Sequence, residues 1–95
     1  MHLHFEWDAE KAANNLRKHG VSFIEASQVF NDPLAIRLFD EDHSDQEERW
    51  VTLGQVFNRR LVVVVHTWQE DDDNMYVRII SARQATAHET QNYEG

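Results

Sequence analysis

The chain of 95 residues has no cysteine, one proline and three glycines. The absence of cysteine excludes disulfides, thiol catalysis and zinc sites built on thiolates. No apolar run approaches the roughly 20 residues that a membrane-spanning helix needs, and the opening M-H-L-H-F-E-W-D lacks the pattern of a secretion signal. We therefore expect a cytoplasmic protein that makes no membrane contact, and the length predicts a single domain over residues 1–95.

Cations are also scarce, because nine Lys and Arg stand against seventeen Asp and Glu and give a formal net charge of −8. This charge argues against broad, nonspecific attraction to nucleic acid, so any contact with RNA requires a local basic site. Much of the acid lies in two runs, residues 40–48 and 70–73. Such runs are usually solvated loops, and the second is predicted to be a hairpin turn.

A strand and a helix are predicted at the start of the chain. Alternation over residues 2–7 is typical of a short strand, and Asp8 is placed to cap a helix that ends at Gly20. One stripe of this helix is apolar, at positions 9, 12, 13 and 16, and we expect it to pack closely. The other stripe is polar and carries two lysines roughly 10 Å apart; its members are Lys11, Asn14, Asn15 and Lys18.

A second helix, a set of strands and a closing helix follow. Ser22 with Glu25 has the spacing of a capping box, so a helix should run from there to about Phe30. Four apolar segments, residues 34–39, 49–57, 60–68 and 76–83, predict an antiparallel meander with residues 62–65 in a central strand. Thr86 with Glu89 predicts a short C-terminal helix. The expected fold is therefore α+β, with a helical hairpin packed on a four- to five-stranded, mainly antiparallel sheet.

Several motifs occur in an order that covers nearly the whole chain: F-E-W-D-x-x-K-A-x-x-N-L-R-K-H-G-V-S-F-x-E-A, V-F-x-D-P-L-A, E-E-R, R-L-V-V-V-V-H-T and R-I-I-S-A-R-x-A-T. This order closely resembles the BrnT family of toxins. The resemblance implies a RelE-like fold and an RNA-cleaving toxin of a type II toxin–antitoxin system that inhibits translation. It also implies a BrnA-like ribbon-helix-helix antitoxin as partner. The complex would repress its own operon, so DNA is contacted only through the antitoxin.

Cleavage of RNA without a metal needs a group that takes the proton of the ribose 2′-hydroxyl, cations around the phosphate and a group that protonates the leaving oxygen. Histidine, lysine and arginine can supply all three without a cofactor. We expect the catalytic residues to be Lys18, His19, His66 and Arg83, and the phosphate-binding residues to be Lys11, Arg49 and Arg78. Each has a plainer alternative: helix capping or solvation for the first helix, burial at a strand end for His66, and salt bridges for the arginines.

Two geometric points limit this site. Strand parity places Arg78 and Arg83 on opposite faces, so both can serve one site only if the chain bends near residues 81–83. His2 and His4 share a strand face and could hold a metal, but the sequence places no third ligand beside them. We therefore expect neither a metal nor a cofactor.

Two other functions stay open. Where members of the resembled family carry cations after the S-A-R motif, this chain has Gln84, Ala87, His88 and Gln91. The missing charge favours a binding module that has lost efficient cleavage and acts only in antitoxin binding and operon repression. In a third interpretation, the acidic residues 40–48 are themselves the interface for a basic antitoxin segment.

Overall fold

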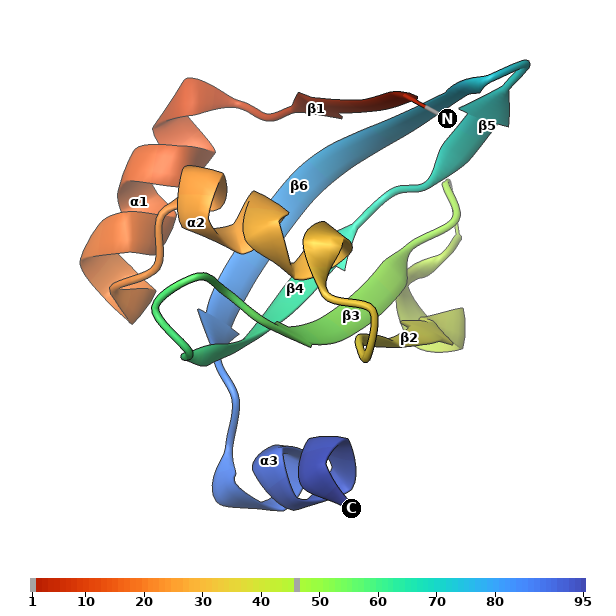
Figure 1. The fold of residues 1–95 in the computed structure, drawn as a ribbon. Coiled ribbons are helices and arrows are strands. Elements are labelled where there is room, and N and C mark those ends of the chain that lie inside the picture. Colours follow the sequence, from red (N-terminus) through yellow and green to blue (C-terminus); the bar gives the residue numbers. More distant parts are fainter. Residues whose placement is uncertain (1, 46) are drawn as a thin grey trace.

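The computed structural model describes residues 2–45 and 47–95. Its strands are β1 (His2–Glu6), β2 (Ile36–Phe39), β3 (Trp50–Gln55), β4 (Leu61–His66), β5 (Gln69–Asp71) and β6 (Asn74–Gln84). Its helices are α1 (Ala9–His19), α2 (Phe23–Ser27) and α3 (Ala87–Glu94), with 3-10 turns η1 (Gln28–Asn31) and η2 (Glu41–His43). The sheet has the order β1-β6-β4-β3-β2, with β5 beside β6, and α1 and α2 lie against one side of it (Figure 1). The α+β class is confirmed.

The sheet is larger and more mixed than the sequence predicted. It has six strands, and β1 pairs in parallel with β6, whereas the other pairs are antiparallel. The extra strand comes from the second acidic run, which forms both the turn at Asp72 and the short strand β5 before it. The second helix is also shorter than predicted, since α2 gives way to the 3-10 turn η1 at Gln28.

Helix α1 buries Asn15 rather than its apolar stripe. The Asn15 amide nitrogen donates to the carbonyls of Val21 (3.0 Å) and Ala82 (2.8 Å), and its oxygen accepts from the Ala82 N–H (3.1 Å). Leu16 of the apolar stripe remains 51% exposed. The reason is that the backbone groups at the edge of β6 need partners. Strand β1 pairs with β6 only as far as Arg78. Further along β6, the Asn15 amide bonds to the backbone of Ala82 as a neighbouring strand would. The expected close packing of the apolar stripe is therefore confirmed only for Ala12, which is partly buried against the core, and was wrong for the rest of the stripe.

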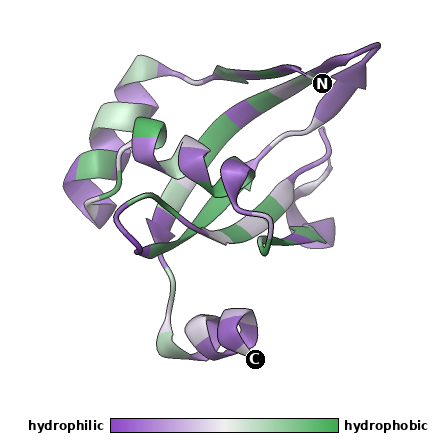
Figure 2. Cartoon of the chain, in the orientation of Figure 1, coloured by the Kyte–Doolittle hydropathy of each residue, from purple (hydrophilic) through white to green (hydrophobic). Residues whose placement is uncertain are grey.

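The main core lies between the helices and the sheet. Val21, Phe23, Ala26 and Val29 cover the apolar side chains that β4 and β6 direct towards them, and the ribbon of β4 is largely hydrophobic, whereas β6 alternates between hydrophobic and hydrophilic residues (Figure 2). At Gly54 a Cβ atom would lie 2.9 Å from the Val29 Cβ, so only glycine lets η1 approach β3 this closely. The prediction of a central strand at residues 62–65 is confirmed, because β4 has neighbours on both sides.

The other face of the sheet, which we call the open face, carries the side chains of Ile36, Leu38, Val51, Leu53 and Val63. Helix α3 packs against β3 and begins at the predicted capping box, in which Thr86 and Glu89 bond to each other's backbone N–H groups. Leu53 and Val63 are buried, whereas Leu38 is 64% exposed. Helix α3 therefore covers only part of the open face.

Strand β6 contains an extra residue at Ile80. Val65 pairs with Ser81, but the next residue, His66, pairs with Ile79, so Ile80 has no opposite residue in β4. A bulge of this kind reverses the alternation of side chains beyond it. Arg78 and Arg83 consequently lie on the same face, the open face. The prediction that parity separates them was wrong, because parity assumes an unbroken strand.

Candidate functional site

Three of the predicted site residues line one hollow between α1 and β6. Lys11, Lys18 and His19 border a space of about 220 Å³ together with Asn14, Asn15, Ile80 and Ser81, and we call these seven residues the basic groove. Its lining contains no carboxylate. The groove therefore concentrates positive charge in a chain whose formal net charge is −8.

Local sequence fixes the helix that carries this groove. The Asp8 carboxylate accepts from the Lys11 N–H at 2.9 Å and caps the start of α1. Gly20 ends α1 in the left-handed conformation (φ 70°), and its N–H donates to the Leu16 carbonyl at 2.9 Å. Lys18 and His19 thus lie in the last turn, at the negative end of the helix dipole. The bulge at Ile80 supplies the opposite wall.

The predicted arginines lie elsewhere and are held by carboxylates. Both terminal nitrogens of Arg83 bond to Glu89 of α3, at 2.7 and 2.9 Å. The Arg83 guanidinium lowers the pKa of Glu89 to about 2, and the same contact raises the pKa of Arg83. Arg78 bonds to Glu47, and Arg49 lies 3.9 Å from that same carboxylate. All three guanidinium groups therefore already have an anionic partner.

His66 is fully buried at the end of β4, on the face that the helices cover. One ring nitrogen, Nδ1, lies 2.9 Å from the Thr67 carbonyl and so carries the hydrogen, which leaves Nε2 to accept from the Thr52 hydroxyl at 2.7 Å. Burial lowers the pKa of His66 to about 4, and the nearby charge of Arg37 acts in the same direction. His66 is therefore neutral at pH 7 and lies on the opposite face from Arg83.

The sequence did not predict a role for Arg37, Thr52 or Trp68, which surround His66. The Arg37 guanidinium lies 4.1 Å from the Trp68 ring centroid, and its Nε donates to the Thr52 hydroxyl at 3.3 Å. Thr52 in turn donates to His66, so a charge at the surface is linked to a buried imidazole. Only the strand register places Arg37 opposite Thr52, and the sequence pattern does not reveal that register.

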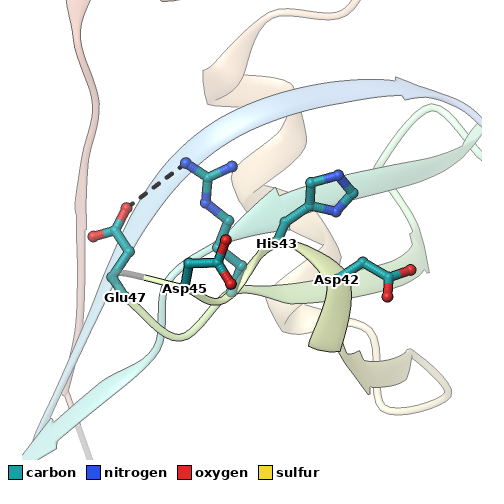
Figure 3. Close-up of a pocket in the computed structure, with 5 residues that line it drawn as sticks. Asp42, His43, Asp45 and Glu47 are labelled. Atoms are coloured by element: carbon teal, nitrogen blue, oxygen red, sulfur yellow. Dashed lines mark ion pairs between the residues drawn. The ribbon is translucent and has the colours of Figure 1, made fainter.

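The described residues of the first acidic run, 40–45 and 47–48, lie between β2 and β3, and we call them the acidic loop (Figure 3). Asp42, His43, Asp45 and Glu47 line a hollow of about 290 Å³ together with Arg49. Asp40 pairs with His43 at 3.0 Å and Glu47 pairs with Arg78. Asp42, Asp45 and Glu48 form no ion pair with another described residue, so this end of the molecule carries uncompensated negative charge.

The two histidines of β1 do not form a metal site with a third side chain. The Nε2 atom of His4 lies 2.8 Å from the Asn74 side-chain oxygen, and its ring stacks on Tyr76 with centroids 4.9 Å apart. Within residues 2–45 and 47–95, no three His, Asp or Glu side chains converge as metal ligands would. None of the described helices has the length and apolar character that would be needed to cross a bilayer.

Comparison with known proteins decides the family. The family model of the ribonuclease toxin BrnT of type II toxin–antitoxin systems matches residues 7–89. The chain belongs to the BrnT family. A BrnT toxin of a type II system implies an antitoxin as partner. No curated protein sequence matches the chain.

The fold of the chain is similar to that of a solved BrnT structure. The crystal structure of the Brucella abortus ribonuclease toxin BrnT matches with a TM-score of 0.60 and 18% sequence identity. The match covers 90% of this chain and 99% of the Brucella chain. The resemblance found in the sequence motifs is therefore confirmed for both family and fold.

Proposed function

We propose that this BrnT-family chain is a metal-independent endoribonuclease of the cytoplasm, which inhibits translation and is neutralised by a BrnA-like ribbon-helix-helix antitoxin. The observation that carries the proposal is the basic groove, where two ammonium groups and an imidazole line one hollow without a carboxylate. Phosphodiester cleavage needs this set of groups, since negative charge develops on the phosphate while two protons move.

In the proposed reaction, the RNA backbone crosses the groove with the scissile phosphate beside Lys18 and a neighbouring phosphate beside Lys11. The His19 imidazole takes the proton of the ribose 2′-hydroxyl as its oxygen attacks the phosphorus. The bond to the 5′ oxygen breaks, and that oxygen receives a proton from the Lys18 ammonium. The products are a 2′,3′-cyclic phosphate and a 5′-hydroxyl, and no metal or cofactor is consumed.

The remaining predicted residues take secondary roles in this proposal. Arg78 and Arg83 can bind phosphate only after Glu47 and Glu89 release them, and the same holds for Arg49. His66 has both ring nitrogens engaged inside the core, so it holds Thr52 and Arg37 in place rather than moving a proton to or from RNA. The basic groove alone is accessible without such a rearrangement.

The proposal predicts the products and the sensitive residues of one reaction. Purified toxin incubated with total RNA in EDTA should leave fragments with cyclic phosphate ends. His19→Asn should lower the cleavage rate at least 100-fold, because general acid–base groups contribute about that much. Lys18→Met should also lower the rate strongly. The control variant His2→Asn, which changes an exposed histidine of β1, should leave the rate within twofold.

Two outcomes would contradict this assignment. If His19→Asn cleaves at the wild-type rate while Arg83→Ala is inactive, the reaction takes place on the open face and not in the basic groove. If cleavage stops when EDTA is added and returns with a divalent metal, the reaction depends on a metal.

The alternative function is a binding module that acts only in antitoxin binding and operon repression. The observation that favours it is the pairing of Arg49, Arg78 and Arg83 with carboxylates, together with the lack of cations in α3. Induced expression without antitoxin distinguishes the two functions. Normal growth with folded, abundant protein and no RNA cleavage in vitro would favour the binding module.

A further inference from the structure

The open face contains an apolar groove that the rest of the chain leaves partly uncovered. The groove has a volume of about 290 Å³ and lies between β2, β3 and β4 on one side and α3 on the other. Its floor is formed by Ile36, Leu38, Val51, Leu53 and Val63, and its rim by His88, Glu89 and Asn92.

One wall of this groove is an exposed sheet edge. Strand β2 pairs with β3 on one side only, which leaves its other edge free among the described strands. Leu38, whose side chain lies on the open face, is 64% exposed. A large exposed apolar side chain beside a free strand edge is typical of an interaction site.

The surroundings of the groove are negatively charged. The acidic loop connects β2 to β3, so its uncompensated carboxylates of Asp42, Asp45 and Glu48 lie at one end of these strands. Helix α3, on the other side, contains Glu94 and no lysine or arginine, while its Glu89 is paired with Arg83. A partner that fits this surface therefore combines apolar anchors with basic residues around them.

We propose that the open-face groove is the docking site for a basic, amphipathic segment of the antitoxin. The proposal rests on the antitoxin that family membership implies, and it does not depend on RNA cleavage. Charge decides between the possible occupants: two copies of this chain would each bring a net charge of −8 to the contact, whereas a basic segment is attracted to it. Apolar side chains of the segment would occupy the groove beside Leu38, and its cations would face the acidic loop.

Binding of full-length antitoxin to the intact toxin tests this docking site. Leu38→Glu should raise Kd at least 10-fold, since it places a charge in the apolar contact. Ile24→Glu is the matched control, because Ile24 is 67% exposed, close to Leu38, but lies on α2. This control should change Kd less than twofold. Thermal unfolding of both variants verifies that they are folded.

A second pair of variants tests the charge. Asp42→Asn with Asp45→Asn should slow association severalfold at low salt, whereas Glu6→Gln with Glu10→Gln, on β1 and α1 at the opposite edge of the sheet, should not. Equal Kd values for the Leu38 and Ile24 variants would overturn the proposal. Loss of self-association of the isolated toxin in Leu38→Glu, without any effect on antitoxin binding, would assign the groove to a second copy instead.

Discussion

His66 illustrates how burial changes what one residue can do. The same imidazole that could act as a base on a surface is here enclosed by Phe30, Trp68 and the sheet. Its hydrogen bonds to Thr67 and Thr52 use both ring nitrogens, and the Arg37 charge discourages protonation. His66 is therefore a neutral, fully hydrogen-bonded imidazole that links Thr52 to Thr67 beside the apolar core.

This burial predicts a pH dependence of stability. An unfolded histidine takes up a proton near pH 6.5, whereas His66 in the fold does so only near pH 4. The unfolded state therefore binds more protons between these values, and the stabilising contribution is complete above pH 6.5 and lost as the pH falls to 4. We expect a loss of roughly 2–3 kcal/mol in the free energy of unfolding, measured by urea titration at several pH values.

The substitution His66→Gln should remove this slope between pH 6.5 and 4.5, although it lowers stability at pH 7. His19→Gln is the control, because His19 is exposed, and it should retain the slope. An unchanged slope in His66→Gln would show that another group takes up the proton.

Helix α3 depends on polar anchors rather than on an apolar stripe of its own. None of its residues is buried, and its ribbon is among the more polar parts of the chain (Figure 2). The anchors are the capping box at Thr86, the double contact of Glu89 with Arg83, and the Tyr93 hydroxyl, which donates to Asp32 at 2.5 Å. The bond to Asp32 raises the pKa of Tyr93 to about 12, so this hydroxyl keeps its proton at neutral pH.

Loss of one anchor should loosen α3 without unfolding the sheet. Glu89→Gln replaces a charged double contact with a neutral one, which should speed hydrogen exchange of the amides of α3 roughly 10-fold at pH 7. In the wild type, the contribution of Glu89 is present above pH 4.5 and is lost as the pH falls towards 2. Glu94→Gln, at the exposed end of α3, is the control. Equal exchange rates in the two variants would contradict the role of Glu89.

At the scale of the whole molecule, the charge distribution limits how RNA can bind. A net charge of −8 repels polyphosphate, and the arginines of the open face are already paired, so we expect the basic groove to supply the main attraction. Few counterions are then released when a single strand binds. Binding of RNA should accordingly depend weakly on salt.

The salt dependence of RNA binding can be measured as a slope. For about two phosphates neutralised by Lys11 and Lys18, log K should fall with log salt with a slope of about −1.4. Lys11→Gln should reduce the slope by about 0.7. Fluorescence anisotropy with a non-cleavable 2′-deoxy strand would measure both. A slope steeper than about −3 would show that the paired arginines also bind phosphate.

Local patterns predicted the helices, their caps and most strands, because a cap or an alternating segment involves only neighbouring residues. The sequence did not reveal that Asn15 is buried or that Arg37 reaches Thr52, since both depend on segments brought together by the fold. The bulge at Ile80 was likewise invisible, and it changes the face on which Arg83 lies. Lys11 and Lys18 were predicted to share a helix face, and they line one groove together with His19.

The contact of Asn15 with Ala82 has a further consequence for how the chain behaves at high concentration. A strand whose backbone groups are left free is a template on which other chains can add, and this is a common route to aggregation. Beyond the end of β1, the edge of β6 would offer such a template at Ala82, but one side-chain amide occupies both its N–H and its carbonyl. A single asparagine thus helps to keep this edge of the sheet from recruiting further copies.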